Sequence, residues 1–89
     1  MKSHITDDFL KVYRRLPNGI RTQARKAYRL FQENPQHPSL QFKRIHSTKP
    51  YFSARINLGY RTLGVLEDGT IIWFWIGSHS EYDRLISQL

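Results

Sequence analysis

Two tight turns, ten residues apart, divide residues 51–82 into three short, largely apolar segments. The first turn is Leu58-Gly59, and the second is Asp68-Gly69, a dipeptide that strongly favours a two-residue hairpin loop. The segments that they separate are Tyr51–Asn57, Tyr60–Leu66 and Thr70–Ile76. Because short turns fix the pairing register of the strands that they join, this stretch predicts a three-stranded antiparallel meander.

The first strand of the meander alternates with a period of two, as a half-buried strand does. Its apolar side chains are Phe52, Ala54 and Ile56, and its polar side chains are Ser53, Arg55 and Asn57. We therefore expect Arg55 to face away from the core.

The third strand is apolar on both faces, with Ile72, Phe74 and Ile76 on one side and Trp73 and Trp75 on the other. This pattern fits a strand that is buried on both sides, and it also fits an aromatic platform. The two indoles are therefore candidates for burial in a core or against a partner protein, and for stacking on nucleic-acid bases, since any base offers a π-face.

Two helices are predicted ahead of the meander, over Thr6–Leu16 and Ile20–Glu33. Each has one apolar stripe at helical spacing, and Thr6 is a candidate N-cap. The stripes consist of Ile5, Phe9, Val12, Tyr13 and Leu16 in the first helix, and of Ile20, Ala24, Ala27, Tyr28 and Phe31 in the second. Pro17-Asn18-Gly19 separates the helices, so they form a hairpin that can pack on one face of the sheet.

The remaining segments complete an α+β fold in one domain, residues 1–89. Prolines in Asn34–Pro38 indicate an extended linker, and Leu40–Ile45 is expected to be a short strand. After the meander, Ser78-x-x-Glu81 is a capping box that begins a short C-terminal helix. The predicted fold is a helical hairpin packed on an antiparallel sheet of about four strands.

The positive charge is concentrated in the first half of the chain. The formal net charge is +7, and residues 1–50 contain eleven Lys or Arg against three acidic residues. Such a surface favours nucleic acid or an acidic protein as a partner. Arg21, Arg25 and Arg29 recur every four residues and form a basic ridge on the second helix. A solvated surface without a partner is the alternative for both features.

Several classes of protein and site are excluded by what the sequence lacks. There is no cysteine and no apolar run near the ~20 residues that span a membrane. No leader peptide is recognisable, so we expect a cytoplasmic protein without membrane contact. Phosphate-loop and dinucleotide motifs are absent, and His37, His46 and His79 lack the spacing of metal ligands. We expect no metal and no cofactor.

The remaining candidates for a functional site are arginine and histidine side chains. Arg55 and Arg61 lie on adjacent predicted strands, and if they share a face they can form a fork for one phosphate. The alternatives are surface charge, or an ion pair with Glu81 or Asp83.

His79 and Tyr82 are the other candidates for chemistry. Imidazole side chains can accept or donate a proton near neutral pH, which makes His79 a general acid or base. The alternative is that His79 only occupies the first turn of the capped helix. Tyr82 lies on the same helix face, and core packing is its alternative.

The element order and these motifs resemble the RelE/ParE superfamily of bacterial toxins from type II toxin–antitoxin modules. The resemblance rests on Arg55, on Gly59-Tyr60-Arg61 and on the run Ile76–Tyr82, and it covers nearly the whole chain. RelE-like toxins are ribosome-dependent endonucleases that cleave mRNA without metal, by attack of a ribose 2′-hydroxyl on the adjacent phosphate. The resemblance implies an mRNA interferase that inhibits translation, with the ribosome, mRNA and a cognate antitoxin as partners.

The resemblance also implies roles for particular residues. Arg61 matches the arginine that stabilises the phosphate, His79 falls where members have arginine or histidine, and Tyr82 lies near a C-terminal tyrosine. Members with a catalytic lysine pair carry it where this chain has Phe52, Ser53 and Ala54. The possible substitutes here are Arg55, Lys43, Lys49 and His46.

Binding surfaces and rival functions follow from the same resemblance. The side chains expected to contact RNA are Lys43, Arg44, His46, Lys49, Trp73 and Trp75. An acidic antitoxin segment is expected to fold over the helices and sheet and to dock on Arg21, Arg25 and Arg29. ParE-type relatives share the fold but poison DNA gyrase, and a non-catalytic RNA-binding module is a third possibility. The ending with His79 and Tyr82 favours the nuclease.

Overall fold

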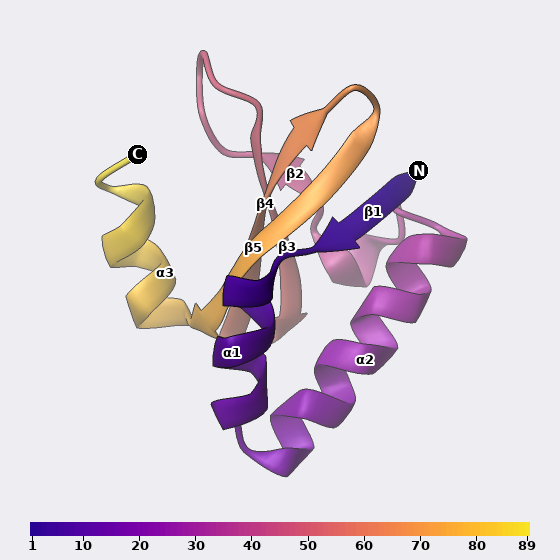
Figure 1. Ribbon diagram of the computed structural model, residues 1–89, viewed down its shortest axis with the longest axis vertical. Helices are drawn as coiled ribbons and strands as arrows, with labels where there is room; N and C mark the ends of the chain where they lie inside the picture. Colours follow the sequence, from indigo (N-terminus) through magenta and orange to yellow (C-terminus); the bar gives the residue numbers. More distant parts are fainter.

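The computed structural model describes residues 1–89 and has helices on both sides of a central sheet (Figure 1). In chain order the elements are β1 (Lys2–Ile5), α1 (Asp7–Arg15), α2 (Asn18–Glu33), the 3₁₀ turn η1 (Pro38–Leu40), β2 (Lys43–Arg44), β3 (Tyr51–Asn57), β4 (Tyr60–Glu67), β5 (Thr70–Ser78) and α3 (His79–Ile86). The strands are ordered β1-β5-β4-β3-β2 across the sheet. No helix is long and apolar enough to cross a membrane. The predicted α+β class is confirmed.

The predicted meander is the centre of this sheet. Strands β3, β4 and β5 pair antiparallel, and both turns lie where the sequence placed them. At the second turn Asp68 and Gly69 have φ of 49° and 77°, as a two-residue hairpin of this kind requires. The register pairs Arg61 of β4 with Arg55 of β3. Since directly opposed residues point to the same side, both arginines lie on one face of the sheet.

A fifth strand was not predicted. Strand β1 pairs in parallel with β5, from Lys2 opposite Thr70 to Ile5 opposite Trp73, and the Thr6 N–H then donates to the Trp73 carbonyl at 3.0 Å. The sheet is therefore mixed and has five strands rather than about four. Four residues are too few to give a clear periodic signal, and the partner strand lies almost seventy residues further along the chain.

The predicted side-chain alternation in β5 is wrong. The pairing with β4 shifts between Trp73 and Trp75, which leaves Phe74 as an extra residue, a β-bulge. Trp73 therefore lies in the core, 3% exposed, while Trp75 lies on the opposite face, where its ring covers Gly77. The Thr62 hydroxyl donates to the Trp75 carbonyl at 2.7 Å beside the irregularity. Core burial, one of the two interpretations of the indoles, is thus confirmed for Trp73.

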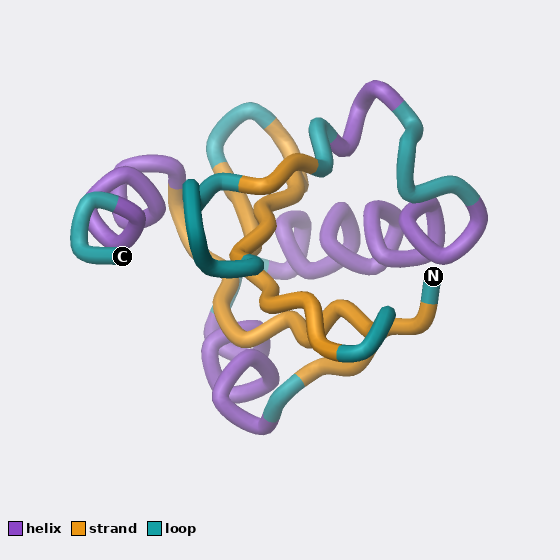
Figure 2. The backbone as a smooth tube through the Cα atoms, turned by 90° about the horizontal axis from the view of Figure 1, so that it is seen from above, coloured by secondary structure: helices purple, strands orange, loops and turns teal.

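The main core lies between the sheet and the first two helices. Its buried residues are Phe9, Ala24, Phe31, Leu40, Ala54, Ile71, Trp73 and Ile76. The Phe31 and Trp73 rings meet edge to face, with centroids 5.3 Å apart. As predicted, Thr6 caps α1, and its hydroxyl oxygen accepts the Phe9 N–H at 3.1 Å. Helices α1 and α2 diverge from their connection (Figures 1 and 2).

The segment predicted as a strand over Leu40–Ile45 is mostly not a strand. Pro38 begins η1, and the His37 ring accepts the Ser39 N–H at its start. Gln41 then takes a left-handed backbone with φ 45° and ψ 42°, so only Lys43 and Arg44 pair with β3. The Pro-initiated turn therefore replaces the first half of the expected strand.

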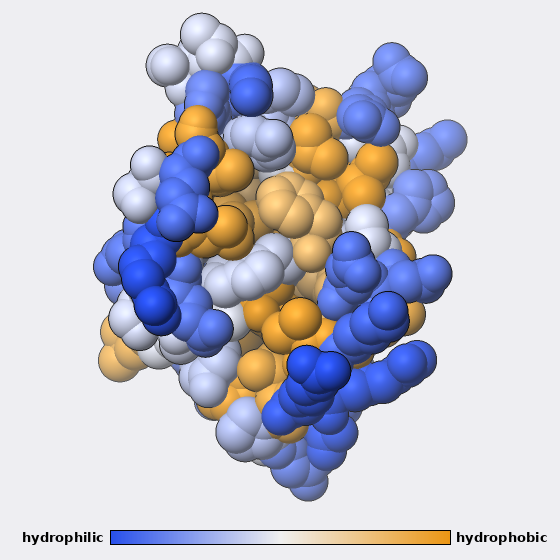
Figure 3. Space-filling view, turned by 60° about the vertical axis from the view of Figure 1, so that its left-hand side comes forward, coloured by the Kyte–Doolittle hydropathy of each residue, from blue (hydrophilic) through white to orange (hydrophobic).

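Helix α3 covers part of the opposite face of the sheet. When the α3 side of the molecule is turned forward, apolar surface is visible between two borders of hydrophilic side chains (Figure 3). The ring of Tyr82 is buried beneath α3, with 5% exposure. The sheet thus has a main core on one face and a smaller packed layer on the other.

The close approach of Trp73 to Gly64 gives a test of the bulged register. A Cβ atom at Gly64 would lie 2.8 Å from Trp73 Cε3 and 3.0 Å from Ile71 Cγ1. Gly64→Ala should therefore lower the free energy of unfolding by about 1–3 kcal/mol, the usual cost of overpacking. Gly19→Ala is the matched control, because nothing lies within 4 Å of its added Cβ. Urea denaturation that finds Gly64→Ala as stable as the wild type would contradict this placement of Trp73.

Candidate functional site

The guanidinium of Arg61 is held by three side chains, one from the residue after η1 and two from α3. Its Nη2 donates to Gln41 Oε1 at 2.9 Å, and its Nε donates to His79 Nδ1 at a longer 3.4 Å. Its Cζ lies 5.4 Å from the centroid of the Tyr82 ring, within cation–π range. None of these contacts is to a carboxylate, so Arg61 is oriented while its positive charge is not neutralised.

His79 begins α3 and is fixed at the edge of the site by backbone and side-chain contacts. Its N–H donates to the Gly59 carbonyl at 2.8 Å, which ties α3 to the turn between β3 and β4. Its Nε2 lies 3.6 Å from Asp83 Oδ2, and its side chain is 47% exposed. Because Nδ1 accepts from Arg61, the neutral ring carries its proton on Nε2, the side that faces Asp83.

The capping box predicted for α3 is confirmed, and it is compatible with the site. Ser78 Oγ accepts the Glu81 N–H, while the Ser78 N–H and hydroxyl donate to Glu81 Oε1 at 3.2 and 2.8 Å. His79 is therefore both a first-turn residue of a capped helix and a neighbour of Arg61. Tyr82 combines two roles in the same way, because its ring is buried and also supports Arg61.

The basic side chains of this chain are almost free of ion pairs. The contact between His79 and Asp83 is the only one within 4.0 Å, so none of the fourteen lysines and arginines pairs with a carboxylate. In particular, Arg55 and Arg61 face one another across the strands without an acidic group between them. Like charges in opposed positions destabilise a sheet. The pair is thus suited to an anion supplied from outside.

One donor of Arg61 is buried and has no acceptor. Its Nη1 atom is inaccessible to solvent and makes no hydrogen bond within the chain. Leaving such a group unpaired costs roughly 1–3 kcal/mol, and more where the group is charged. A small shift of the guanidinium toward a bound anion would give this atom an acceptor.

The candidates to replace a lysine pair separate into two groups. Ser53 lies on the same face of β3 as Arg55, but it is 0% exposed and is therefore not available to a substrate. Lys43 of the edge strand β2 pairs directly with Ser53, and its side chain therefore shares the face of Arg55 and Arg61. Arg55 and Lys43 are thus on the site's side of the sheet.

His46 and Lys49 instead lie in the loop between β2 and β3, and Arg44 is the last residue of β2 before that loop. His46 Nδ1 accepts the Lys49 N–H at 3.0 Å, and Nε2 lies 2.9 Å from the Leu89 carbonyl oxygen, so both ring nitrogens are engaged. Arg44 donates to the carbonyls of His46 and Thr48 at 3.1 and 3.0 Å. The side chain of Lys49 is exposed. His46 and Arg44 therefore hold the loop in place through these hydrogen bonds.

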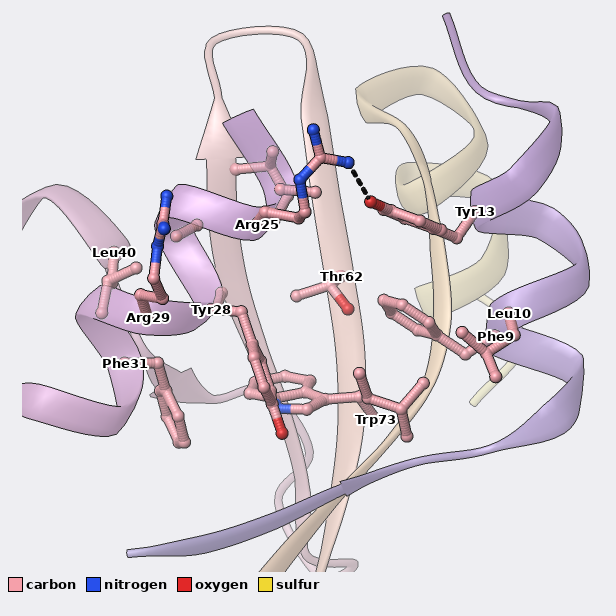
Figure 4. A pocket seen from close by; sticks show the side chains of 15 residues that line it. Phe9, Leu10, Tyr13, Arg25, Tyr28, Arg29, Phe31, Leu40, Thr62 and Trp73 are labelled. Carbon is pink, nitrogen blue, oxygen red and sulfur yellow. Dashed lines mark hydrogen bonds between the residues drawn. The ribbon is translucent and has the colours of Figure 1, made fainter. Parts of the chain in front are cut away.

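An apolar groove of about 380 Å³ lies between α1, α2 and the sheet. Phe9 and Tyr13 line one side of it, and Thr62 and Trp73 lie at the sheet (Figure 4). Arg25 crosses it, since its Nη1 donates to the Tyr13 hydroxyl at 2.7 Å (Figure 4).

The predicted basic ridge only partly borders this groove. Arg25 and Arg29 are among its lining residues. Arg21 is not, and its Nη2 donates to Asn18 within the same helix. A cationic border and an apolar floor would suit a partner segment that is both acidic and amphipathic.

The fold and the sequence together define a small toxin domain of the ParE-like family. The sequence profile of the ParE-like toxin domain matches residues 18–84, which is most of the chain, so the chain belongs to that family. The resemblance to the RelE/ParE superfamily is confirmed. By sequence, no protein of established annotation matches the chain.

Solved structures show the same fold at low identity. The chain is similar to a protein of the RelB–RelE antitoxin–toxin complex of Methanococcus jannaschii, with a TM-score of 0.71 and 22% identity over 90% of this chain and 95% of that one. It is similar to YafQ of E. coli, with a TM-score of 0.67 and 15% identity over 91% and 96%. It is also similar to the isolated E. coli RelE toxin, with a TM-score of 0.64 and 16% identity over 99% and 98%.

Two residues of the site were not predicted from the sequence. Gln41, which accepts from Arg61, lies in a segment that was expected to be a strand, and no motif surrounds it. Asp83 was considered only as a partner for arginine, whereas it lies beside His79. Its i, i+4 spacing from His79 on a predicted helix was the available signal. The sequence contains no comparable signal for Gln41.

The capping box of α3 should make the stability of this helix depend on pH. Hydrogen bonds from the Ser78 hydroxyl and N–H, assisted by the charge of Arg84, lower the pKa of Glu81. A lowered folded-state pKa means that the cap stabilises α3 fully above the ordinary carboxyl pKa of about 4.3, and that this stabilisation is lost as the pH falls through the lowered value. Ser78→Ala should raise the pKa of Glu81 in an NMR titration. Ser87→Ala, at the other end of α3, should leave that titration unchanged, and equal effects of the two variants would contradict the cap assignment.

Proposed function

We propose that the protein is the toxin of a type II toxin–antitoxin module and that it cleaves mRNA on the ribosome. The observation that carries the proposal is the Arg61 cluster, a guanidinium oriented by neutral and aromatic groups and left without a carboxylate partner. Such a group binds a phosphate and stabilises charge that develops on it. The proposed class agrees with the RelE and YafQ toxins, whose fold this chain shares.

The proposed reaction is an internal transfer of the phosphate within the RNA chain. The 2′-hydroxyl of one nucleotide attacks the adjacent phosphorus, a 2′-O–P bond forms and the P–O5′ bond breaks. The products are a 2′,3′-cyclic phosphate and a 5′-hydroxyl. The reaction requires a group that removes the 2′ proton, a cation beside the phosphoryl oxygens, and a donor that protonates the leaving 5′-oxygen.

Arg61 would stabilise the phosphoryl oxygens, and Arg55 would add a second positive charge on the same face. The negative charge on those oxygens grows during the attack, so a preorganised guanidinium stabilises the transition state more than the ground state. The unpaired Nη1 of Arg61 would gain an acceptor at the same time. Tyr82 would keep the guanidinium in place from below and would not itself transfer a proton.

His79 would act as the general acid. The imidazolium form would transfer its Nδ1 proton, on the side that faces Arg61, to the leaving 5′-oxygen. The ring would then be neutral, with Nδ1 accepting from Arg61 and the remaining proton on Nε2. Asp83, 3.6 Å from Nε2, would favour this tautomer. Lys43, on the same sheet face as Arg55, is the candidate for the group that accepts the 2′ proton, which it would do in its neutral form.

Substitutions of Arg61 and His79 should both slow cleavage, but they should respond differently to a change of the leaving group. Arg61→Ala should lower the single-turnover rate on programmed ribosomes by roughly 10²- to 10³-fold. His79→Ala should lose roughly 10²- to 10⁴-fold. A substrate with sulfur in place of the leaving 5′-oxygen should restore His79→Ala alone, because a thiolate leaves without protonation. Melting curves should show both variants folded.

Two results would contradict these roles. If the sulfur substrate restores Arg61→Ala as well as His79→Ala, the separation between charge stabilisation and acid catalysis fails. If the wild type inhibits DNA gyrase supercoiling and leaves ribosome-bound mRNA intact, the ParE-type alternative is correct. That alternative is kept because the matching family profile is named for ParE.

We also propose that a cognate antitoxin occupies the groove between α1 and α2. Among solved relatives, the proteins of M. jannaschii and E. coli form RelB–RelE and RelBE complexes. An amphipathic antitoxin segment could place apolar side chains on the groove floor and acidic side chains against Arg25 and Arg29. Arg21 would contribute less, because it bonds Asn18 outside the groove.

The antitoxin proposal predicts that reversing the charge of arginines at the groove weakens antitoxin binding, and that reversing it elsewhere on the helices does not. Arg25→Glu combined with Arg29→Glu should weaken binding of the antitoxin at low salt by at least about 10-fold, through loss of charge complementarity. Arg14→Glu combined with Arg15→Glu is the matched control, since both are exposed on α1 and do not line the groove. Equal losses in calorimetric titrations of the two double variants would mean that only net charge matters.

A further inference from the structure

Gln41 has a backbone conformation that glutamine rarely adopts. Its φ of 45° and ψ of 42° lie in the left-handed region, and Asp68 in the turn between β4 and β5 is the only other non-glycine residue with positive φ. Glycine takes this conformation without the clash that a Cβ atom causes. The glutamine side chain at this position therefore has a cost in stability that a glycine would avoid.

The side chain of Gln41 makes one hydrogen bond, and that bond is to Arg61. Its Oε1 accepts from Arg61 Nη2 at 2.9 Å. The residue is otherwise exposed, so it contributes little to the packed core. Its backbone N–H ends η1 by donating to the Pro38 carbonyl, a bond that glycine could make equally well.

An amide at position 41 differs from a carboxylate in one respect that matters for binding phosphate. A glutamate would accept the same hydrogen bond, but it would pair with the guanidinium and compete with an incoming anion. A neutral amide oxygen fixes the plane of the guanidinium and leaves its charge available. His79 Nδ1 and the ring of Tyr82, the other two contacts of Arg61, are also uncharged acceptors.

We propose that Gln41 is the positioning residue for Arg61, which it holds in the plane required by the substrate phosphate without neutralising it. The inference rests on the proposed function insofar as Arg61 is the phosphate-binding group. The left-handed turn after η1 brings the amide from the edge of the sheet to the central strand. The strain at Gln41 is the consequence of that placement.

The positioning can be measured without any reaction. In wild-type protein, NMR of the Arg61 guanidinium should show slow rotation about the Nε–Cζ bond, because Gln41 and His79 restrain two of its nitrogens. Gln41→Gly should accelerate this rotation and leave the melting temperature equal or higher. Asp68→Gly is the matched control, since it relieves a similar backbone strain far from Arg61 and should leave the rotation unchanged. Unchanged Arg61 rotation in Gln41→Gly would overturn the proposal.

Activity on programmed ribosomes supplies the second measurement. Gln41→Gly should lower kcat by about 10- to 100-fold with little change in KM, as expected when a reacting group is misaligned while binding is kept. Gln41→Glu should lower kcat at least as much while Arg61 rotation stays slow. Asp68→Gly should cleave like the wild type. A fully active Gln41→Glu would overturn the claim that a neutral acceptor is required. If the wild type cleaves no mRNA, the proposed function fails, and the rotation measurement still decides the role of Gln41.

Discussion

Arg61 lies in the middle of the sheet, opposite Arg55 on β3 and Gly77 on β5, because two short turns fix the register of the central meander. A slip of one residue would exchange the two faces of each strand. It would carry Arg61 into the apolar layer beneath α1 and α2 and would expose Thr62 and Gly64 instead. The same pairing that buries the core therefore also gathers the charged side chains on the opposite face.

The site is built at some cost in stability. Two arginines oppose each other, one guanidinium nitrogen is buried without an acceptor, and Gln41 has a left-handed backbone. The seven acidic residues offer no relief, since none of them lies within 4.0 Å of a lysine or arginine. A phosphate would relieve two of these three costs, since it separates the arginines and accepts from the buried nitrogen. Unfavourable local features of this kind are expected where a surface is complementary to a ligand.

Local signals in the sequence predicted most of the fold. The two turns, the alternation of β3, the Thr6 cap and the capping box of α3 each depend on residues within a few positions of one another, and all four are confirmed. The features that were predicted wrongly or missed depend on contacts between residues far apart in the sequence. Strand β1 exists only because β5 is there to pair with it, and the bulge at Phe74 depends on packing of Trp73 against Gly64 from the neighbouring strand.

The candidate site follows the same division. Arg61, His79 and Tyr82 were predicted, because each lies in a recognisable hairpin or helix start, and the structure brings them into contact. Gln41 was not predicted, because its contact with Arg61 crosses twenty residues and depends on an unusual backbone angle. His46 and Arg44 were predicted to bind RNA. In the structure Arg44 donates to carbonyls of the loop that follows β2, and His46 bonds both that loop and Leu89.

The central claim is that the 2′-hydroxyl of the RNA is the nucleophile at a phosphate held by Arg61. The most direct measurement uses ribosomes programmed with an mRNA that carries a single 2′-deoxy nucleotide on the 5′ side of the cleaved bond. The account predicts no cleavage at that bond, together with a 2′,3′-cyclic phosphate end on the product of the unmodified message. Cleavage of the 2′-deoxy message at the wild-type rate would contradict the account.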